Sequence, residues 1–251
     1  MKKIHLTIIA VITITVAAAQ AKIVYNAYKP GLSMRDKPGA QSTVVTKIPY
    51  GEKLTLVNPV NDTVTVINEG MTGYWNLVEY KGQKGYVVGI YLFEMIPPKS
   101  NIKTMQEYFT QITAPAGAPV LVTAGKEDEE MHSRYKKQLY KNGCEYHEAH
   151  FYESGYNTYF IPGFTLQQGF ILIRLIPEFK DVFGTSDAYP SVSKKIKITQ
   201  PGEGEKEIKV IKDDSNSWIE KIKVAYEQGA VYEFEMYELH GQLVISFGGG
   251  V

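Results

Sequence analysis

The sequence predicts a mainly β protein in which a small β-barrel precedes an α+β domain that ends in an antiparallel meander. Three observations support this prediction. Short stretches of alternating apolar and polar residues, separated by Gly, Pro and Asn, fill residues 25–95. Two apolar segments with helical features follow within residues 102–176, and alternation returns in longer stretches from residue 194 onward. Alternation with a period of two is typical of half-buried strands, and many short strands are typical of a barrel or sandwich.

The N-terminus has the pattern of a signal peptide. A basic "MKK" precedes the apolar run "IHLTIIAVITITV", and the small residues Ala19 and Ala21 follow it. We therefore predict a signal peptide over residues 1–21, cleaved before Lys22. A membrane anchor or a buried strand are the alternatives, but the apolar run is short for the ~20 residues that a span needs. We expect a periplasmic or secreted protein without stable membrane insertion after cleavage.

Composition and charge argue against a nucleic-acid partner and against internal disulfides. The chain has 251 residues, is 44% hydrophobic and carries 27 basic against 27 acidic side chains. Cleavage of the signal peptide would remove Lys2 and Lys3 and no acidic residue, which leaves 25 basic side chains against 27 acidic ones. A nearly neutral chain without blocks of like charge gives no reason to expect a nucleic-acid partner. Cys144 is the single cysteine, so the fold depends on a hydrophobic core and not on disulfides.

Residues 22–96 are predicted to form the barrel. In "GLSMRDKPG", Leu32 and Met34 alternate with polar neighbours and should face the barrel core. Arg35 ends this strand, where its stem can cover apolar surface while the guanidinium stays hydrated. Pro38-Gly39 then turns the chain into a loop. Further on, "YWNLVEYKGQKGYVV" predicts two strands around Lys81-Gly82. We expect about five strands in all.

The order of these features resembles the bacterial SH3 domain over roughly residues 24–95. That family opens with G-L-x-hydrophobic-R and a Pro-containing loop, and it closes with an aromatic strand, a Gly-bearing hairpin, G-aromatic-V and a final Tyr-Leu. The stretches "GLSMRDKPGAQSTVVTKIPYGEKLTLV" and "GYWNLVEYKGQKGYVVGIYL" carry these features in order. The connection "NPVNDTVTVINEGMTG" is longer than the family's usual one. The resemblance implies an SH3-like barrel that binds cell-wall peptides or similar extended ligands.

Dense aromatic side chains in this segment provide the candidate ligand-binding residues. In SH3-like barrels, aromatic-lined grooves hold extended peptides. The opposing interpretation is that the aromatics fill a small core. Core packing is favoured for Trp75 and Tyr86, which match core-facing positions of the family, and both interpretations stay open for the other three. The candidates are Tyr28, Tyr50, Trp75, Tyr86 and Tyr91.

A linker over residues 97–101 separates the barrel from a second domain over residues 102–251, which resembles no family that we recognise. The prolines of "IPPKSN" stiffen the linker. Ser100 or Asn101 is expected to cap a short helix that follows, because apolar residues then recur at helical spacing.

Two segments of the second domain allow alternative interpretations. Asn142-Gly143 between aromatic-rich flanks predicts a β-hairpin, which we favour over a helix across residues 128–140. In "FTLQQGFILIRLIPEF", Thr165 and Gln168 form a capping box that predicts a helix. Gly169 weakens this prediction and leaves a buried strand as the alternative.

The C-terminal part, from residue 194, is predicted to be the meander. In "AVYEFEMYEL", alternate residues Tyr232, Phe234 and Met236 face one side, and Glu233 and Glu235 face the other. Lysines alternate in the same way in the neighbouring stretches, so we expect cross-strand charge pairs on a solvated face.

The stretch "CEYHEAH" is the strongest candidate for chemistry, and its spacing argues against a site. On a strand, Cys144 and His150 share one face while His147 points to the other. A zinc site needs three or four convergent ligands. No G-x-S-x-G motif or P-loop is present. We therefore assign no catalytic residue, no metal ligand and no cofactor.

These observations favour an exported, non-catalytic envelope protein whose barrel binds peptidoglycan peptide or another extended protein segment. The alternative is a cell-envelope hydrolase with an unrecognised active site in the second domain, built from Cys144, His147 or His150. A third possibility is an envelope protein that binds partners or serves only a structural role. Whether the protein is an enzyme stays open, with the non-catalytic interpretation preferred.

Overall fold

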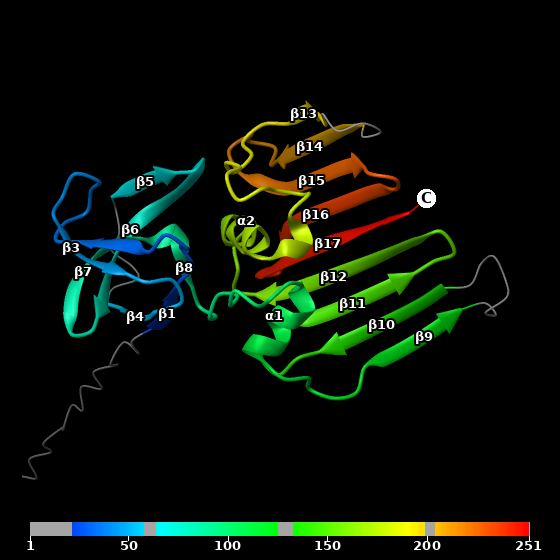
Figure 1. Cartoon of the computed structure of the whole chain (residues 1–251), viewed down its shortest axis with the longest axis horizontal. Helices are drawn as coiled ribbons and strands as arrows, with labels where there is room; N and C mark the ends of the chain where they lie inside the picture. The colour runs from blue at the N-terminus through cyan, green and yellow to red at the C-terminus, as the bar shows by residue number, and fades with distance from the viewer. Residues whose placement is uncertain (1–21, 58–63, 125–132, 199–203, 251) are drawn as a thin grey trace, which may run out of the picture.

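The computed structural model describes residues 22–57, 64–124, 133–198 and 204–250, which form two antiparallel sheets and two α-helices (Figure 1). The prediction of a mainly β protein with a barrel, an α+β part and a meander is confirmed. The predicted signal peptide, residues 1–21, lies outside the described residues, as do residues 58–63 of the long connection. Within the described ranges, no helix is long and apolar enough to cross a membrane.

The first sheet forms the barrel, with strand order β3-β2-β7-β6-β4-β1-β8 and β5 paired to β6. Leu32 and Met34 are 3% and 0% exposed, so the predicted inward face of that strand is confirmed. Lys81-Gly82 forms the two-residue turn of a hairpin in which Tyr80 pairs with Gln83. Over the described residues, the barrel has eight strands where about five were expected. The additional strands are short segments at both ends of the barrel sequence and in the long connection, which also pair. The eight strands are β1 (Lys22–Asn26), β2 (Leu32–Arg35), β3 (Val44–Ile48), β4 (Lys53–Leu56), β5 (Thr65–Asn68), β6 (Met71–Tyr80), β7 (Gln83–Val88) and β8 (Leu92–Phe93), with the 3-10 turn η1 (Gly89–Tyr91) before β8.

The second sheet has nine strands in the order β13-β14-β15-β16-β17-β12-β11-β10-β9. Its middle is the pair β12 and β17, so the C-terminal strand of the meander joins the two halves of the sheet. The strands are β9 (Val120–Ala124), β10 (Ser133–Leu139), β11 (Glu145–His150), β12 (Ser154–Pro162), β13 (Lys194–Lys197), β14 (Glu205–Lys212), β15 (Ile219–Glu227), β16 (Val231–Leu239) and β17 (Gln242–Gly250).

Two helices pack on one face of this sheet. In α1 (Met105–Ile112), the Phe109 ring meets the Tyr159 ring of β12 edge-on at 5.9 Å. In α2 (Leu166–Leu175), Gly169 lies directly over Leu243 and Met236. The 3-10 turn η2 (Pro177–Phe179) follows α2. The helices therefore cover the apolar face of the sheet.

Both helices begin at capping boxes. Thr165 and Gln168 cap α2 as predicted, so the helix is confirmed and the strand alternative is wrong. The cap of α1 is Thr104 with Glu107, and the prediction of Ser100 or Asn101 is wrong. Thr104 can satisfy the reciprocal bonds because the acidic residue lies three positions after it.

The hairpin predicted at Asn142-Gly143 is confirmed. Strands β10 and β11 pair from Leu139 with Glu145 to Arg134 with His150, so the alternative helix is wrong over residues 133–139. Its first residues, 128–132, lie outside the described residues. In the meander, Phe234 and Met236 are buried, while Glu235 on the other face lies 3.1 Å from the Lys221 ammonium and also pairs with Lys223. The predicted alternation and its cross-strand charge pairs are thus present.

The barrel and the second sheet share one hydrophobic core. A continuous cluster of buried side chains runs from Val24 in β1 to Ile245 in β17. At the seam, the Phe93 ring of the barrel meets the Phe164 ring at 4.8 Å. The linker is also fastened, since the Tyr50 hydroxyl donates to the Pro98 carbonyl at 2.7 Å. The two parts are therefore packed together and not merely tethered.

Gly169 tests the packing of α2 on the sheet. A Cβ at this position would lie 2.6 Å from a methyl of Leu243 and 2.8 Å from the Met236 sulfur. We expect Gly169→Val to lower the free energy of unfolding by about 2 kcal/mol through overpacking, although valine is the better helix former. Urea unfolding of both proteins measures this difference. Gln167→Ala, at the neighbouring partly exposed position, should change stability little, and an unchanged midpoint for Gly169→Val would contradict the packing described.

Candidate functional site

Helix α2 is buried on almost all sides because it lies between the sheet and the barrel (Figure 1). Its Gly169 side faces the sheet, and the Gln168 amide donates to the Leu92 carbonyl of the barrel at 2.8 Å. Ile171 and Leu175 lie beside barrel residues at a cavity described below. A helix that is apolar on most of its circumference requires such two-sided burial.

The hairpin of β5 and β6 reaches from the barrel to the second domain. Glu69 and Gly70 form its two-residue turn, and both have left-handed backbone angles, with φ of 50° and 78°. The Tyr189 amide donates to the Glu69 carbonyl at 2.8 Å. A Cβ on Gly70 would lie 2.8 Å from the Tyr189 carbonyl oxygen. Only glycine therefore allows the tip to press this closely against the second domain.

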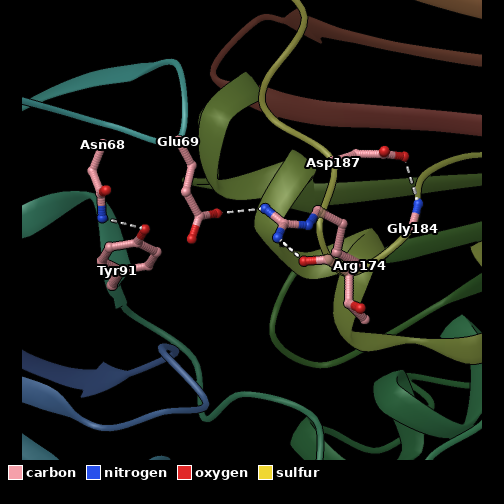
Figure 2. Close-up of polar contacts among 7 residues, drawn as sticks. Asn68, Glu69, Tyr91, Arg174, Gly184 and Asp187 are labelled. Atoms are coloured by element: carbon pink, nitrogen blue, oxygen red, sulfur yellow. Dashed lines mark hydrogen bonds and ion pairs between the residues drawn. The ribbon is translucent and has the colours of Figure 1, made fainter.

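This close approach places Glu69 against Arg174 at the end of α2. The Glu69 carboxylate lies 2.7 Å from Nη1 of Arg174, and Nη2 donates to the Thr185 carbonyl (Figure 2). The Gly184 amide donates to the Asp187 carboxylate at 2.7 Å, which closes the turn that carries Thr185. Arg174 thus connects the barrel hairpin to a loop of the second domain.

Two aromatic side chains of the barrel stand next to this ion pair. The rings of Tyr28 and Tyr91 lie 4.4 Å apart at an angle of 41°. The Asn68 side-chain amide donates to the Tyr91 hydroxyl at 2.8 Å (Figure 2). Burial raises the pKa of the Tyr91 hydroxyl above its usual value. Tyr91 therefore remains a neutral phenol. The buried Asn26 side chain holds the start of the Tyr28 segment, because it accepts from the Tyr28 amide at 2.8 Å.

A cavity of about 220 Å³ opens between these groups. The barrel contributes Tyr28, Tyr91 and Glu69, and α2 contributes Arg174 together with aliphatic side chains. Its lining is mainly apolar and includes three charged residues, Lys29, Glu69 and Arg174. This combination is typical of small-ligand and peptide sites, where apolar walls give affinity and a few polar groups give orientation.

The structure brings together two of the five predicted ligand-binding residues. Tyr28 and Tyr91 line the cavity. Trp75 is only 5% exposed within the barrel, and Tyr86 is half-buried on β7. The Tyr50 hydroxyl holds the linker, as described above. At this cavity the two barrel tyrosines face residues of the second domain, and their role in ligand binding stays a prediction.

The sequence patterns did not single out Glu69 and Arg174 as functional residues. Arg174 is the one charged residue in the apolar run "FILIRLI", and a charge inside a buried helix needs a partner. That signal was present in the sequence. The partner was not identifiable, because Glu69 lies 105 positions earlier and meets Arg174 only after the domains dock.

Cys144, His147 and His150 do not converge. The Cys144 side chain is fully buried, and burial raises its pKa to about 11. His147 lies on the other face of β11, where its ring bonds the Tyr135 hydroxyl and the Glu145 carboxylate, both at 3.0 Å. In the part of the chain that the structure describes, no cluster of three His, Cys, Asp or Glu residues suits a metal ion.

Comparison with protein families agrees with the barrel. Residues 30–92 match the model of the bacterial SH3 domain. The barrel is a bacterial SH3 domain. The match covers about a quarter of the chain and ends before the linker. No curated protein and no solved structure gives a significant match to the sequence. The α2 side of the cavity therefore lies outside the matched SH3 segment.

Burial of Cys144 predicts a chemically inert thiol. With a pKa of about 11, roughly one thousandth of this thiol is ionised at pH 8, and the core also blocks access. We expect a thiol-exchange reagent such as Ellman's reagent to modify the native protein at least ~100-fold more slowly than the unfolded chain. Spectrophotometric rates at pH 8, with glutathione as the reference thiol, measure this. A native rate equal to that of glutathione would point to an exposed, activated cysteine.

Proposed function

We propose that this protein is an exported, non-catalytic envelope protein that binds cell-wall peptide or another extended peptide. The site is the cavity between the bacterial SH3 domain and α2. The observation that carries this proposal is the position of Tyr28, whose partly exposed ring stands beside the buried Tyr91 ring at an apolar cavity.

The composition of the cavity supports peptide binding over catalysis. Aromatic walls offer large contact areas at little cost in side-chain entropy, as in other peptide-binding sites. Of the three charged groups in the lining, Glu69 and Arg174 are paired with each other and Lys29 is exposed. Burial raises the pKa of Tyr91 and keeps it neutral. None of these groups is poised as a nucleophile or a general base. Cys144 is buried away from solvent, which removes the support for a thiol-based hydrolase.

Retention on purified cell-wall sacculi tests this proposal. We expect the protein to sediment with sacculi, and we expect Tyr28→Ala to lower its affinity by about 10-fold or more, since aromatic residues at the centre of an interface commonly contribute ~2 kcal/mol. Tyr28 is suited to this test because it is only partly buried, so its removal disturbs the core less than removal of Tyr91.

Tyr74→Ala is the matched control. Tyr74 lies on β6, is 51% exposed and does not line the cavity. It should bind sacculi as the unaltered protein does. Binding that survives Tyr28→Ala would move the site elsewhere on the barrel, and an unaltered protein that stays in the supernatant would contradict binding to the cell wall.

A further inference from the structure

The charged residues that line the cavity between the domains do not balance, and this indicates the charge of the ligand that would fit there. Lys29 and Arg174 line it as cations, and Glu69 is the acidic residue in the lining. Because Glu69 is already paired with Arg174 at 2.7 Å, it neutralises only one of the two positive charges. The cavity therefore has an excess of one positive charge, and an anionic group would complement it.

Arg174 has donors to spare. Its guanidinium carries five N–H groups in a fixed fork. One is used by Glu69 and one by the Thr185 carbonyl, while the buried Nε has no hydrogen-bond partner among the described residues. An unsatisfied donor of a charged group is costly to bury. Arg174 also lines the cavity, so the Nη1 and Nη2 N–H groups that these two bonds leave over can donate to an anionic group there without loss of the Glu69 pair.

The remaining walls limit the size and character of the group that carries this anion. Tyr28 and Tyr91 form one wall, and Ile171 and Leu175 of α2 contribute aliphatic surface. A volume of about 220 Å³ corresponds to roughly seven water molecules, which suits one or two small residues and no bulky side chain. The occupant thus combines a small apolar part with a negative charge.

We propose that this cavity binds the free C-terminal end of a peptide that finishes in small aliphatic residues. The terminal carboxylate bonds Arg174 and the Lys29 ammonium, and the last side chain packs between the tyrosine pair and α2. This inference rests on the proposed peptide-binding function and narrows it from any extended segment to a chain end. An amino terminus is disfavoured because it would add a third positive charge.

Binding of three short peptides to the purified protein tests this, by isothermal titration calorimetry at low ionic strength. The probes are N-acetyl-trialanine as the free acid, the same peptide as the C-terminal amide, and N-acetyl-Ala-Glu-Ala amide, which carries its carboxylate on a side chain. We expect the free acid to bind about 10-fold more tightly than the amide, since a charge-assisted pair is about twice as strong as a neutral one. The glutamate peptide should bind like the amide.

Charge variants give opposite expected results. Lys29→Gln should weaken binding of the free acid about 3-fold, while Glu69→Gln should tighten it by a similar factor, because it removes a negative charge that repels the peptide carboxylate. Lys84→Gln is the matched control, since Lys84 is exposed on β7, away from the cavity. Circular dichroism confirms that each variant is folded.

The outcomes separate this inference from the proposed function. Equal binding of acid and amide, or weaker binding by Glu69→Gln, would overturn selection of a chain end while leaving peptide binding intact. Preference for the glutamate peptide would indicate that the cavity binds acidic side chains, and this result would also overturn the inference of a chain-end site. If none of the three peptides binds, the inference fails, and retention on sacculi then decides the proposed function by itself.

Discussion

The contact between the β5–β6 hairpin and α2 determines how the two domains are arranged. Glu69 and Arg174 meet there across the seam between the barrel and the second sheet. Their side chains are 31% and 12% exposed, so the pair is neither fully buried nor freely hydrated. An exposed ion pair adds at most ~1 kcal/mol, and a buried one offsets much of its attraction by desolvation. The pair alone therefore does not hold the domains together.

Burial of apolar surface supplies most of the free energy that holds the barrel against the second domain. The Phe93 and Phe164 rings meet at 4.8 Å, and the buried cluster continues through α2 into the sheet. Aromatic rings of this kind bury 150–250 Å² each, which at about 25 cal/mol per Å² gives several kcal/mol per ring. Such apolar packing opposes separation of the two domains, but because it is non-directional it does not fix their relative position. The ion pair and the Tyr189–Glu69 backbone bond fix the register in which the surfaces meet. The cavity exists because of that register.

This arrangement explains why local patterns predicted the elements and missed the site. Strands, the Asn142-Gly143 hairpin and the Thr165 cap follow from neighbouring residues, and these predictions are confirmed. Thr104 was missed because several polar residues before α1 can cap it, and the reciprocal Glu107 bond decides between them. The cavity depends on residues that are far apart in the chain, within 27–91 and 171–185. Tyr28 was a candidate from the sequence, whereas its neighbour Arg174 was only an unexplained charge in an apolar helix.

A lasting cavity requires that the SH3 barrel and the second domain tumble in solution as one rigid body. Backbone ¹⁵N relaxation of the purified protein tests it most directly, because it reports the rotational correlation time of each domain separately. We expect the same correlation time for amides in β2, β6 and β7 as for amides in β12, β16 and β17. A distinctly shorter correlation time for the barrel would show that it reorients independently, and a cavity built from both domains would then not persist.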